Sequence, residues 1–277
     1  STQATLEWQP GSDATAATAA TPEVLKATVE LKANNLGGFY DDIFFRGLTS
    51  DLNGNLDTSA AFALETPERT VTLDGIDVGV PIENIKLNFR FDRNARQLLV
   101  SSVSGDVLGG SIGGNDLRYE FGAARNDLKL VFSGLRLERM LELADYDGVQ
   151  ANGAVSGELP LTLTETGVVV TGGSLRGDAP GGNIRYGAGV TGSAGNPGID
   201  LVNKALANYQ FDSLISTIEY SPEGELVLAM QMQGTNPDMS KDQRVNLNLN
   251  LTDNIPDLLK SLQAARDIEG FLQGQYQ

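Results

Sequence analysis

The sequence predicts a mainly β protein, built on an antiparallel sheet of about twelve to fourteen strands with about three short helices. Apolar and polar residues alternate along most of the 277 residues, which is typical of strands with one apolar and one hydrated face. Short apolar runs are separated by Gly, Asn and Pro, which favour tight turns. Helical spacing of apolar residues is confined to three short segments.

The N-terminal part is expected to hold one short strand and a loop. Leu6 and Trp8 alternate with polar neighbours, and residues 10–22 are an Ala/Thr-rich stretch with proline near both ends. From residue 25 onward, strands follow one another without a linker. We therefore divide the chain into residues 1–24, an N-terminal strand and flexible Ala/Thr loop, and residues 25–277, a single elongated β domain.

Period-two alternation marks the strands whose apolar side chains share one face. The candidate lining residues of such a face are Leu87, Phe89, Phe91, Leu128, Leu130, Phe132, Leu226, Leu228, Met230 and Met232. A last strand alternates Val245, Leu247, Leu249 and Leu251 with asparagines. Because it is last, one of its edges is expected to lack a neighbour within the chain, and exposed edges bind extended peptides.

Turns and helices complete the prediction. In residues 148–186, Asn152-Gly153, Gly172-Gly173 and residues 180–182 predict the turns of a meander of short strands. Helical spacing predicts helices over residues 137–145, over residues 201–209 after Asp200 as a cap, and over residues 255–265 after Asp253 or Asn254.

Composition excludes several function classes. The net charge of −16 repels nucleic acid and anionic surfaces. The chain has neither histidine nor cysteine, so Ser-His and Cys-His triads and thiolate metal sites cannot be built. We predict no catalytic residue, no metal and no cofactor. No apolar run of 18 residues is present, so no helix that spans a bilayer is expected in this stretch.

Two motifs suggest ligand sites but favour simpler interpretations. Residues 51–57 alternate Asp and Asn, yet glycine and the twelfth residue stand at the wrong positions for a calcium loop, so a hairpin with a turn at Asn53-Gly54 is predicted. The glycine-rich residues 109–114 and 192–198 lack the βαβ context and the Lys-Ser/Thr ending of phosphate loops, which favours turns or loops.

A single flat sheet of this many strands is too wide to stay open and uncovered. Three short helices cannot cover its apolar face. The sheet therefore either closes on itself, as a sandwich or barrel, or leaves a groove filled by something apolar.

Three segments are similar to the C-terminal region of the YdbH family, bacterial relatives of the AsmA and TamB proteins. They are LERMLELADYDGVQANGAVSGELPLTL (137–163), GVVVTGGSLRGDAPGGNIRY (167–186) and VNLNLNLTDNIPDLLKSLQ (245–263). The resemblance implies a long, curved sheet with a hydrophobic concave face, and a role in moving phospholipid between the two membranes of Gram-negative bacteria. It also implies an inner-membrane anchor upstream and a small outer-membrane lipoprotein partner at the C-terminal end.

With this resemblance, the favoured function is a periplasmic segment of an intermembrane phospholipid-transfer bridge. The ten candidate lining residues would hold acyl chains along a β-groove formed by residues 25–277. The lipoprotein would add a strand at the edge of residues 245–251. The alternative is a secreted or surface β-rich scaffold or adhesin with an ordinary closed core.

Overall fold

The structure is a computed structural model that describes residues 3–8, 26–40, 43–57, 63–78, 80–92, 96–144, 148–187, 204–239 and 244–254. These residues form one open antiparallel sheet of sixteen strands, which confirms the predicted fold class. One helix, α1 (Leu137–Ala144), has both bounds within them, and residues 204–206 are also helical. The predicted loop at residues 10–22 and the predicted helix at residues 255–265 lie outside the described residues.

The strands of the first half of the chain are mostly long. They are β1 (Gln3–Trp8), β2 (Lys26–Tyr40), β3 (Ile43–Asp57), β4 (Ala63–Glu65), β5 (Arg69–Asp77), β6 (Pro81–Asp92), β7 (Gln97–Val107) and β8 (Gly110–Glu120). The second half adds β9 (Arg125–Arg136), β10 (Val149–Asn152), β11 (Ala154–Thr164), β12 (Gly167–Gly177), β13 (Gly182–Tyr186), β14 (Tyr209–Tyr220), β15 (Glu225–Thr235) and β16 (Arg244–Asn254).

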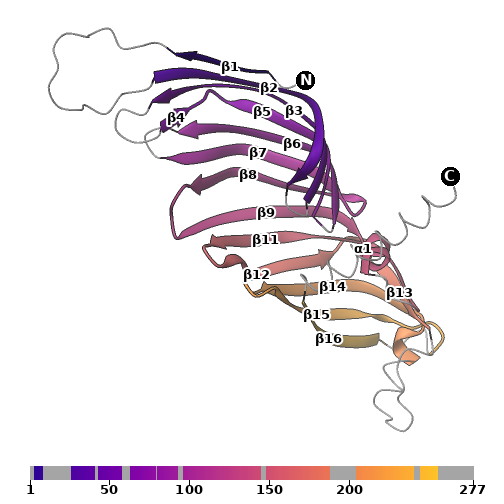
Figure 1. Cartoon of the computed structure of the whole chain (residues 1–277). Helices are drawn as coiled ribbons and strands as arrows, with labels where there is room; N and C mark the ends of the chain where they lie inside the picture. The colour runs from indigo at the N-terminus through magenta and orange to yellow at the C-terminus, as the bar shows by residue number, and fades with distance from the viewer. Residues whose placement is uncertain are drawn as a thin grey trace, which may run out of the picture. The chain divides into compact units, whose positions relative to one another are not determined.

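The chain divides into two compact units. The first comprises Ser1–Gly105 and Gly113–Leu128, and the second comprises Asp106–Ile112 and Lys129–Gln277. In the first unit, β1, β2, β3, β5, β6, β7 and β8 are successive neighbours, and β4 pairs with the end of β3 (Figure 1). From β2 onward, sequential strands joined by short connections explain this simple order. The turn between β7 and β8 consists of Leu108 and Gly109, both with positive φ, as a two-residue hairpin requires.

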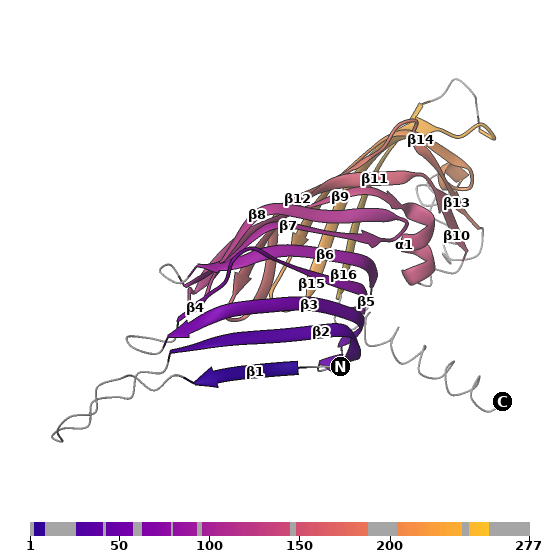
Figure 2. The ribbon, with the colours of Figure 1, turned by 90° about the horizontal axis from the view of Figure 1, so that it is seen from above.

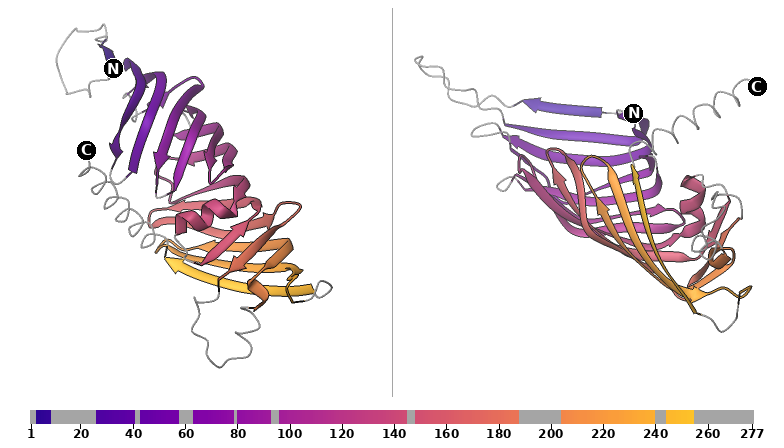
Figure 3. Two further views of the ribbon diagram at one scale, coloured as in Figure 1. Left: turned by 90° about the vertical axis from the view of Figure 1, so that its right-hand side faces the viewer. Right: turned by 90° about the horizontal axis from the view of Figure 1, so that it is seen from below.

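In the second unit, β14 is the central strand. Residues Val170–Arg176 of β12 pair with residues Ile215–Tyr220 of β14, whereas β13 pairs with its first three residues. On its other side, β14 pairs with β15, which pairs with β16. Helix α1 contacts β10, which pairs with β13 (Figure 2). Figure 3 shows β14, β15 and β16 as neighbouring strands of this unit.

Of the three turns predicted in residues 148–186, the one at residues 180–182 is confirmed between β12 and β13, with the Gly181 N–H donating to the Asp178 carbonyl at 2.8 Å. The other two are wrong. The hairpin turn of this segment lies at Glu165 and Thr166, between β11 and β12. Gly153 instead lies between β10 and β11, which follow each other without a hairpin and pair with β13 and β12. Gly172 and Gly173 lie within β12, where its pairing with β14 changes register. Glycine accommodates positive φ in a bulge or bend as readily as in a turn, so these signals were assigned to the wrong kind of irregularity.

Two further predictions need correction. The expected turn at Asn53-Gly54 is absent, because both residues pair with β2 inside strand β3. Alternate side chains of a strand point to opposite faces, so the acidic residues of this segment do not converge on one site. The helix predicted over residues 201–209 ends before Tyr209, which begins β14; residues 201–203 lie outside the described residues.

A group of well-buried residues lies where the helical residues 204–206 meet β14 and the end of β15. Tyr209, Phe211, Ala205 and Asn236 are almost inaccessible to solvent. The Asn236 amide donates hydrogen bonds to the carbonyl oxygens of Lys204 and Ala205, at 2.7 and 3.0 Å. These bonds satisfy carbonyls at the end of a helix and fix it to the end of β15.

Candidate functional site

Strands β5 and β6 bring the predicted lining residues of the first unit onto one face. Val71 lies opposite Leu87, and Leu73 opposite Ile85, so these apolar side chains point to the same side of the sheet. Phe89 is buried, whereas Leu87 and Phe91 are half-buried. The other face of the same strands is polar, with a hydrogen bond of 2.6 Å from Thr70 to Asn88.

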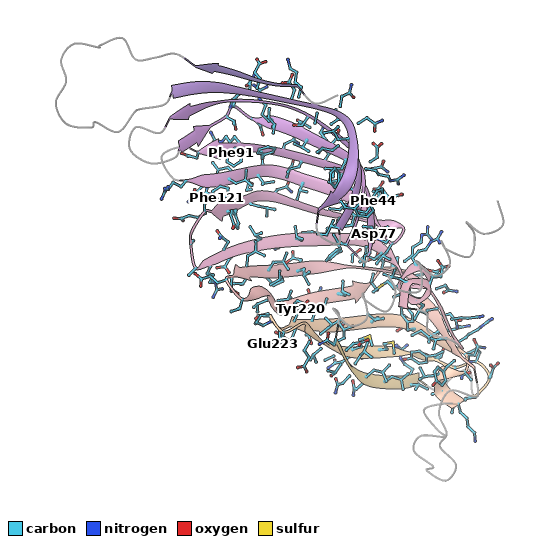
Figure 4. The ribbon with its side chains drawn as sticks, in the orientation of Figure 1. Phe44, Asp77, Phe91, Phe121, Tyr220 and Glu223 are labelled. Atoms are coloured by element: carbon cyan, nitrogen blue, oxygen red, sulfur yellow. The ribbon has the colours of Figure 1, made fainter. Side chains whose placement is uncertain are left out.

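An aromatic cluster extends this face at the ends of β6 and β8. The rings of Phe89 and Phe91 meet edge to face at 5.6 Å, and Phe91 stacks on Phe121 at 6.0 Å (Figure 4). Tyr119 meets Phe121 at 5.1 Å. Phe121 keeps 49% of its surface exposed. Tyr119 and Phe121 are not among the predicted lining residues, although their period-two spacing was a usable signal.

In the second unit, β14, β15 and β16 share a wide apolar face. Leu228 lies between Ile218 and Leu251, and Met230 lies between Ser216 and Leu249. A third row contains Leu214, Met232 and Leu247, and a fourth contains Tyr220 and Leu226 and ends at Asp253 of β16. The apolar residues predicted for the edge strand therefore lie on the same face as the predicted lining residues, because β16 pairs with β15 in register.

Strand β9 presents Leu128, Leu130 and Phe132 on one of its faces. All three are half-buried, and they alternate with the exposed residues Asp127, Lys129, Val131 and Ser133. Lys129 forms an ion pair with Glu158 at 2.7 Å, with both side chains more than half exposed. The structure thus confirms the alternation of this strand, with its apolar side less accessible than its polar side.

Partial burial is the main property of the predicted lining residues. Of the ten, only Phe89 and Met232 are buried, at 6% and 1% exposure; the other eight keep intermediate accessibility. Residues in a closed sandwich core would be packed on all sides and almost fully buried. This pattern does not match the closed core of the alternative scaffold or adhesin.

The opposite face of β15 and β16 is mostly polar, with Glu225 and Arg244 at its two ends. Asn246, Asn248 and Asn250 are exposed, and the first two lie opposite the exposed Gln233 and Gln231. This face needs no covering layer. The polar and apolar faces of the same strands are therefore clearly separated.

Strand β16 lies at an edge of the sheet. Among the described residues it pairs with β15 alone. The Tyr209 hydroxyl donates a hydrogen bond of 2.8 Å to the carbonyl oxygen of Val245, and Arg244 forms an ion pair of 2.9 Å with Asp212. These contacts hold the start of β16 to β14.

The described residues contain no cluster of acidic side chains arranged to hold a metal ion. Within the same part of the chain, no helix is long and apolar enough to cross a membrane. The described strands offer an apolar face, a polar face and the free edge of β16. Burial raises the pKa of Tyr209 to about 12, with a smaller contribution from Asp212, so this phenol is protonated at neutral pH.

Comparison with protein-family models gives one match. The model described as "YdbH-like: Intermembrane phospholipid transport protein YdbH" matches residues 1–277. A comparison with curated proteins and another with solved structures gave no match.

Proposed function

Because the chain belongs to the YdbH-like family of intermembrane phospholipid transport proteins, we propose that its half-buried apolar faces hold lipid acyl chains during transport. The family is one of lipid transporters rather than enzymes, and its function is carried out in the cell envelope. The observation that supports the proposal most directly is the partial burial of eight of the ten predicted lining residues.

The energetics of the proposal rest on apolar surface alone. Each buried CH₂ contributes about 0.8 kcal/mol, so one long acyl chain gains on the order of 10 kcal/mol before the costs of ordering. Rows such as Ile218, Leu228 and Leu251 offer apolar contacts across three strands. No headgroup pocket is needed for lipids to move along such a surface.

Site-specific photo-crosslinking tests which face holds lipid. A photoreactive residue at Leu228 or Leu249 should crosslink to co-purifying phospholipid. The matched controls are Gln231 and Asn248, neighbours in the same two strands that lie on the opposite face. Equal crosslinking on both faces, or a purified protein without lipid by native mass spectrometry, would contradict the proposal.

The residues proposed to line the groove are Leu87, Phe89, Phe91, Leu128, Leu130, Phe132, Leu226, Leu228, Met230 and Met232. We propose that residues 25–277 act as one groove domain in the periplasm, with an inner-membrane anchor upstream. A crosslink from lipid to Leu87 and to Leu228 in the same preparation would support a function shared by both units. Lipid confined to one position would contradict it.

The edge of β16 is the proposed docking place of a small outer-membrane lipoprotein, which would add a strand there. Along an edge strand, successive backbone N–H groups point alternately to the neighbour and outward. Proline substitutions at Val245, Asn246, Leu247 and Asn248 should therefore fall into two classes. The class with outward N–H groups should stay folded and lose the partner in co-purification.

If every proline variant and a chain without residues 245–277 still bound the partner, the docking site would lie elsewhere.

The edge strand has a second role in this proposal, through its apolar residues Val245, Leu247, Leu249 and Leu251. They extend the acyl-chain surface of β15 up to the edge at which the partner strand would continue it.

A further inference from the structure

Three neighbouring strands of the first unit break the alternation of apolar and polar residues at the same level of the sheet. In β6, Ile82 and Ile85 are half-buried, whereas Glu83 and Asn84 between them are exposed. Strict alternation would send the two isoleucines to opposite faces. The same step of two polar or glycine residues between two apolar residues recurs in residues 45–48 of β3 and residues 73–76 of β5.

The apolar residues on both sides of this step lie on one face. A Cβ added to Gly105 of the neighbouring strand β7 would lie 3.0 Å from Cγ2 of Ile82 and 3.3 Å from Cγ1 of Ile85, so both side chains project to the same side of β6. Ile82 pairs with Ile76 of β5, which pairs with Phe45 of β3. Since directly paired residues project to the same side of a sheet, this row of three shares the face of Ile85.

The charged residues at the step project to the other face. Arg46 pairs with Gly75, and Gly75 pairs with Glu83, one position away from the apolar row in each strand. The Arg46 guanidinium crosses β5 and donates a 2.7 Å hydrogen bond from Nη2 to Oε1 of Glu83. Glycine at residue 75 leaves room for this crossing, because a Cβ there would lie 2.9 Å from Arg46 Nε. The charges are therefore kept off the apolar face.

Two residues with left-handed backbone account for the change of side. The φ angle is 70° at Gly47 and 51° at Asn84, and each lies between the charged residue and the next apolar residue of its strand. Beyond Asn84, β6 resumes its pairing with β5 in the register that it left at Ile85. Glycine and asparagine adopt positive φ more readily than most residues. Two successive side chains are thus kept on the polar face, and alternation then continues with the apolar residues on their original side.

We propose that Phe45, Ile76 and Ile82 form a second row of acyl-chain contacts in the first unit, with Gly47 and Asn84 as positioning residues. This inference rests on the proposed function and extends the lipid-holding surface beyond the predicted lining residues. The three side chains are half-buried, as most of those residues are. Strict alternation along β3 and β6 would have assigned all three to the wrong face.

Phe44 and Phe45 give a matched test, because they are adjacent residues of one type on opposite faces. Phe44 pairs with Asp77 and keeps 41% of its surface exposed (Figure 4). Benzoylphenylalanine at residue 45 should crosslink to the phospholipid that co-purifies with the whole chain, whereas the same residue at position 44 should not. A crosslink at Phe44 in place of Phe45 would overturn the inference, because lipid would then follow strict alternation or mere exposure.

Variants of Asn84 test the positioning role. A photoreactive residue at Ile82 reports the second row, and one at Leu87 reports the predicted lining surface of the same strand. Asn84→Gly keeps access to positive φ and should retain both crosslinks. Asn84→Val should lose the Ile82 crosslink and retain the Leu87 crosslink, because a β-branched residue strongly disfavours positive φ. Asn84→Ala disfavours it more mildly and provides the measurement if Asn84→Val does not fold, as judged by circular dichroism.

The outcomes separate this inference from the proposed function. A chain that crosslinks to lipid at none of Phe45, Ile82 and Leu87 overturns the proposed function for this unit. Lipid at Leu87 alone overturns the second row, while the proposed function stands. Equal crosslinking at Phe44 and Phe45 also overturns it, because the two faces would then not differ. An undiminished Ile82 crosslink in a folded Asn84→Val overturns the positioning role of Asn84.

Discussion

The hydroxyl of Tyr209 donates a 2.8 Å hydrogen bond to the carbonyl oxygen of Val245, connecting the first residue of β14 to the start of the edge strand β16. Tyr209 has no accessible surface. Strand β15 lies between the two, and Gly234 of β15 pairs with both Phe211 and Val245. One buried side chain thus stabilises three strands of the second unit.

Tyr209→Phe should lower the free energy of unfolding by about 1 kcal/mol, because the Val245 carbonyl loses a buried donor without a change in packing volume. Tyr220→Phe is the control, since Tyr220 is half-buried in the same strand. Urea unfolding monitored by circular dichroism measures both. An equal effect of the two substitutions would show that the Val245 bond adds no stability.

The free energy of unfolding should decrease as the pH rises through the range in which the Tyr209 hydroxyl loses its proton. Burial and then the charge of Asp212 raise the pKa of this phenol from 10.0 to about 12. The unfolded chain therefore loses its proton first, so stability is complete below pH 10 and declines as pH rises towards 12. Tyr209→Phe should show a shallower decline in urea titrations. A parallel decline in both proteins would contradict this assignment.

Gly182→Ala should destabilise the second unit by about 1–3 kcal/mol through overpacking. A Cβ at residue 182 would lie 2.5 Å from Cζ of Phe211 and 2.1 Å from the carbonyl oxygen of Asn152. Gly187→Ala is the control, because its Cβ would meet nothing closer than 3.3 Å. Thermal unfolding distinguishes them. Similar unfolding midpoints for both variants would show that Phe211 and its neighbours can shift to make room for the added methyl group.

Ser50→Ala should leave stability unchanged or raise it by up to about 1 kcal/mol, because a buried hydroxyl without a partner among the described residues is removed. Ser156→Ala should instead cost about 1–3 kcal/mol. The Ser156 hydroxyl accepts from the Gly134 N–H and donates to Asp178, both at 2.9 Å. Urea unfolding of the two variants gives the comparison, and a destabilised Ser50→Ala would reveal a hydrogen bond not accounted for.

Aspartate substitutions in β15 should distinguish positions that line the groove from positions that are packed in the protein interior. Met232→Asp should cost roughly 3–5 kcal/mol, because Met232 is 1% exposed and an unpaired charge would be buried there. Leu228→Asp, at a half-buried position on the same face, should leave the fold intact and reduce the co-purifying phospholipid. Circular dichroism and lipid extraction measure the two effects. Unfolding of Leu228→Asp would favour a closed core.

Much of the candidate site could be predicted from alternation alone. Leu226, Leu228, Met230 and Met232 share a face because side chains alternate along any strand. Tyr119 at the end of β8 and Phe121 just after it alternate as usable strand positions, but only strand packing brings Phe121 onto Phe91, which is a long-range property.

The sequence by itself determined the fold class, the helix at residues 137–144 and the absence of histidine and cysteine chemistry. These depend on local spacing and composition. The sequence did not determine the hairpin at Leu108 and Gly109, because the turn or loop predicted over residues 109–114 is strand β8 from Gly110 onward. Only the tertiary structure decided that Asn53 and Gly54 lie inside β3, and that Gly153 bends a strand path. Local signals cannot distinguish a turn from a bend, because both need the same backbone freedom and differ only in which distant strand supplies the hydrogen bonds.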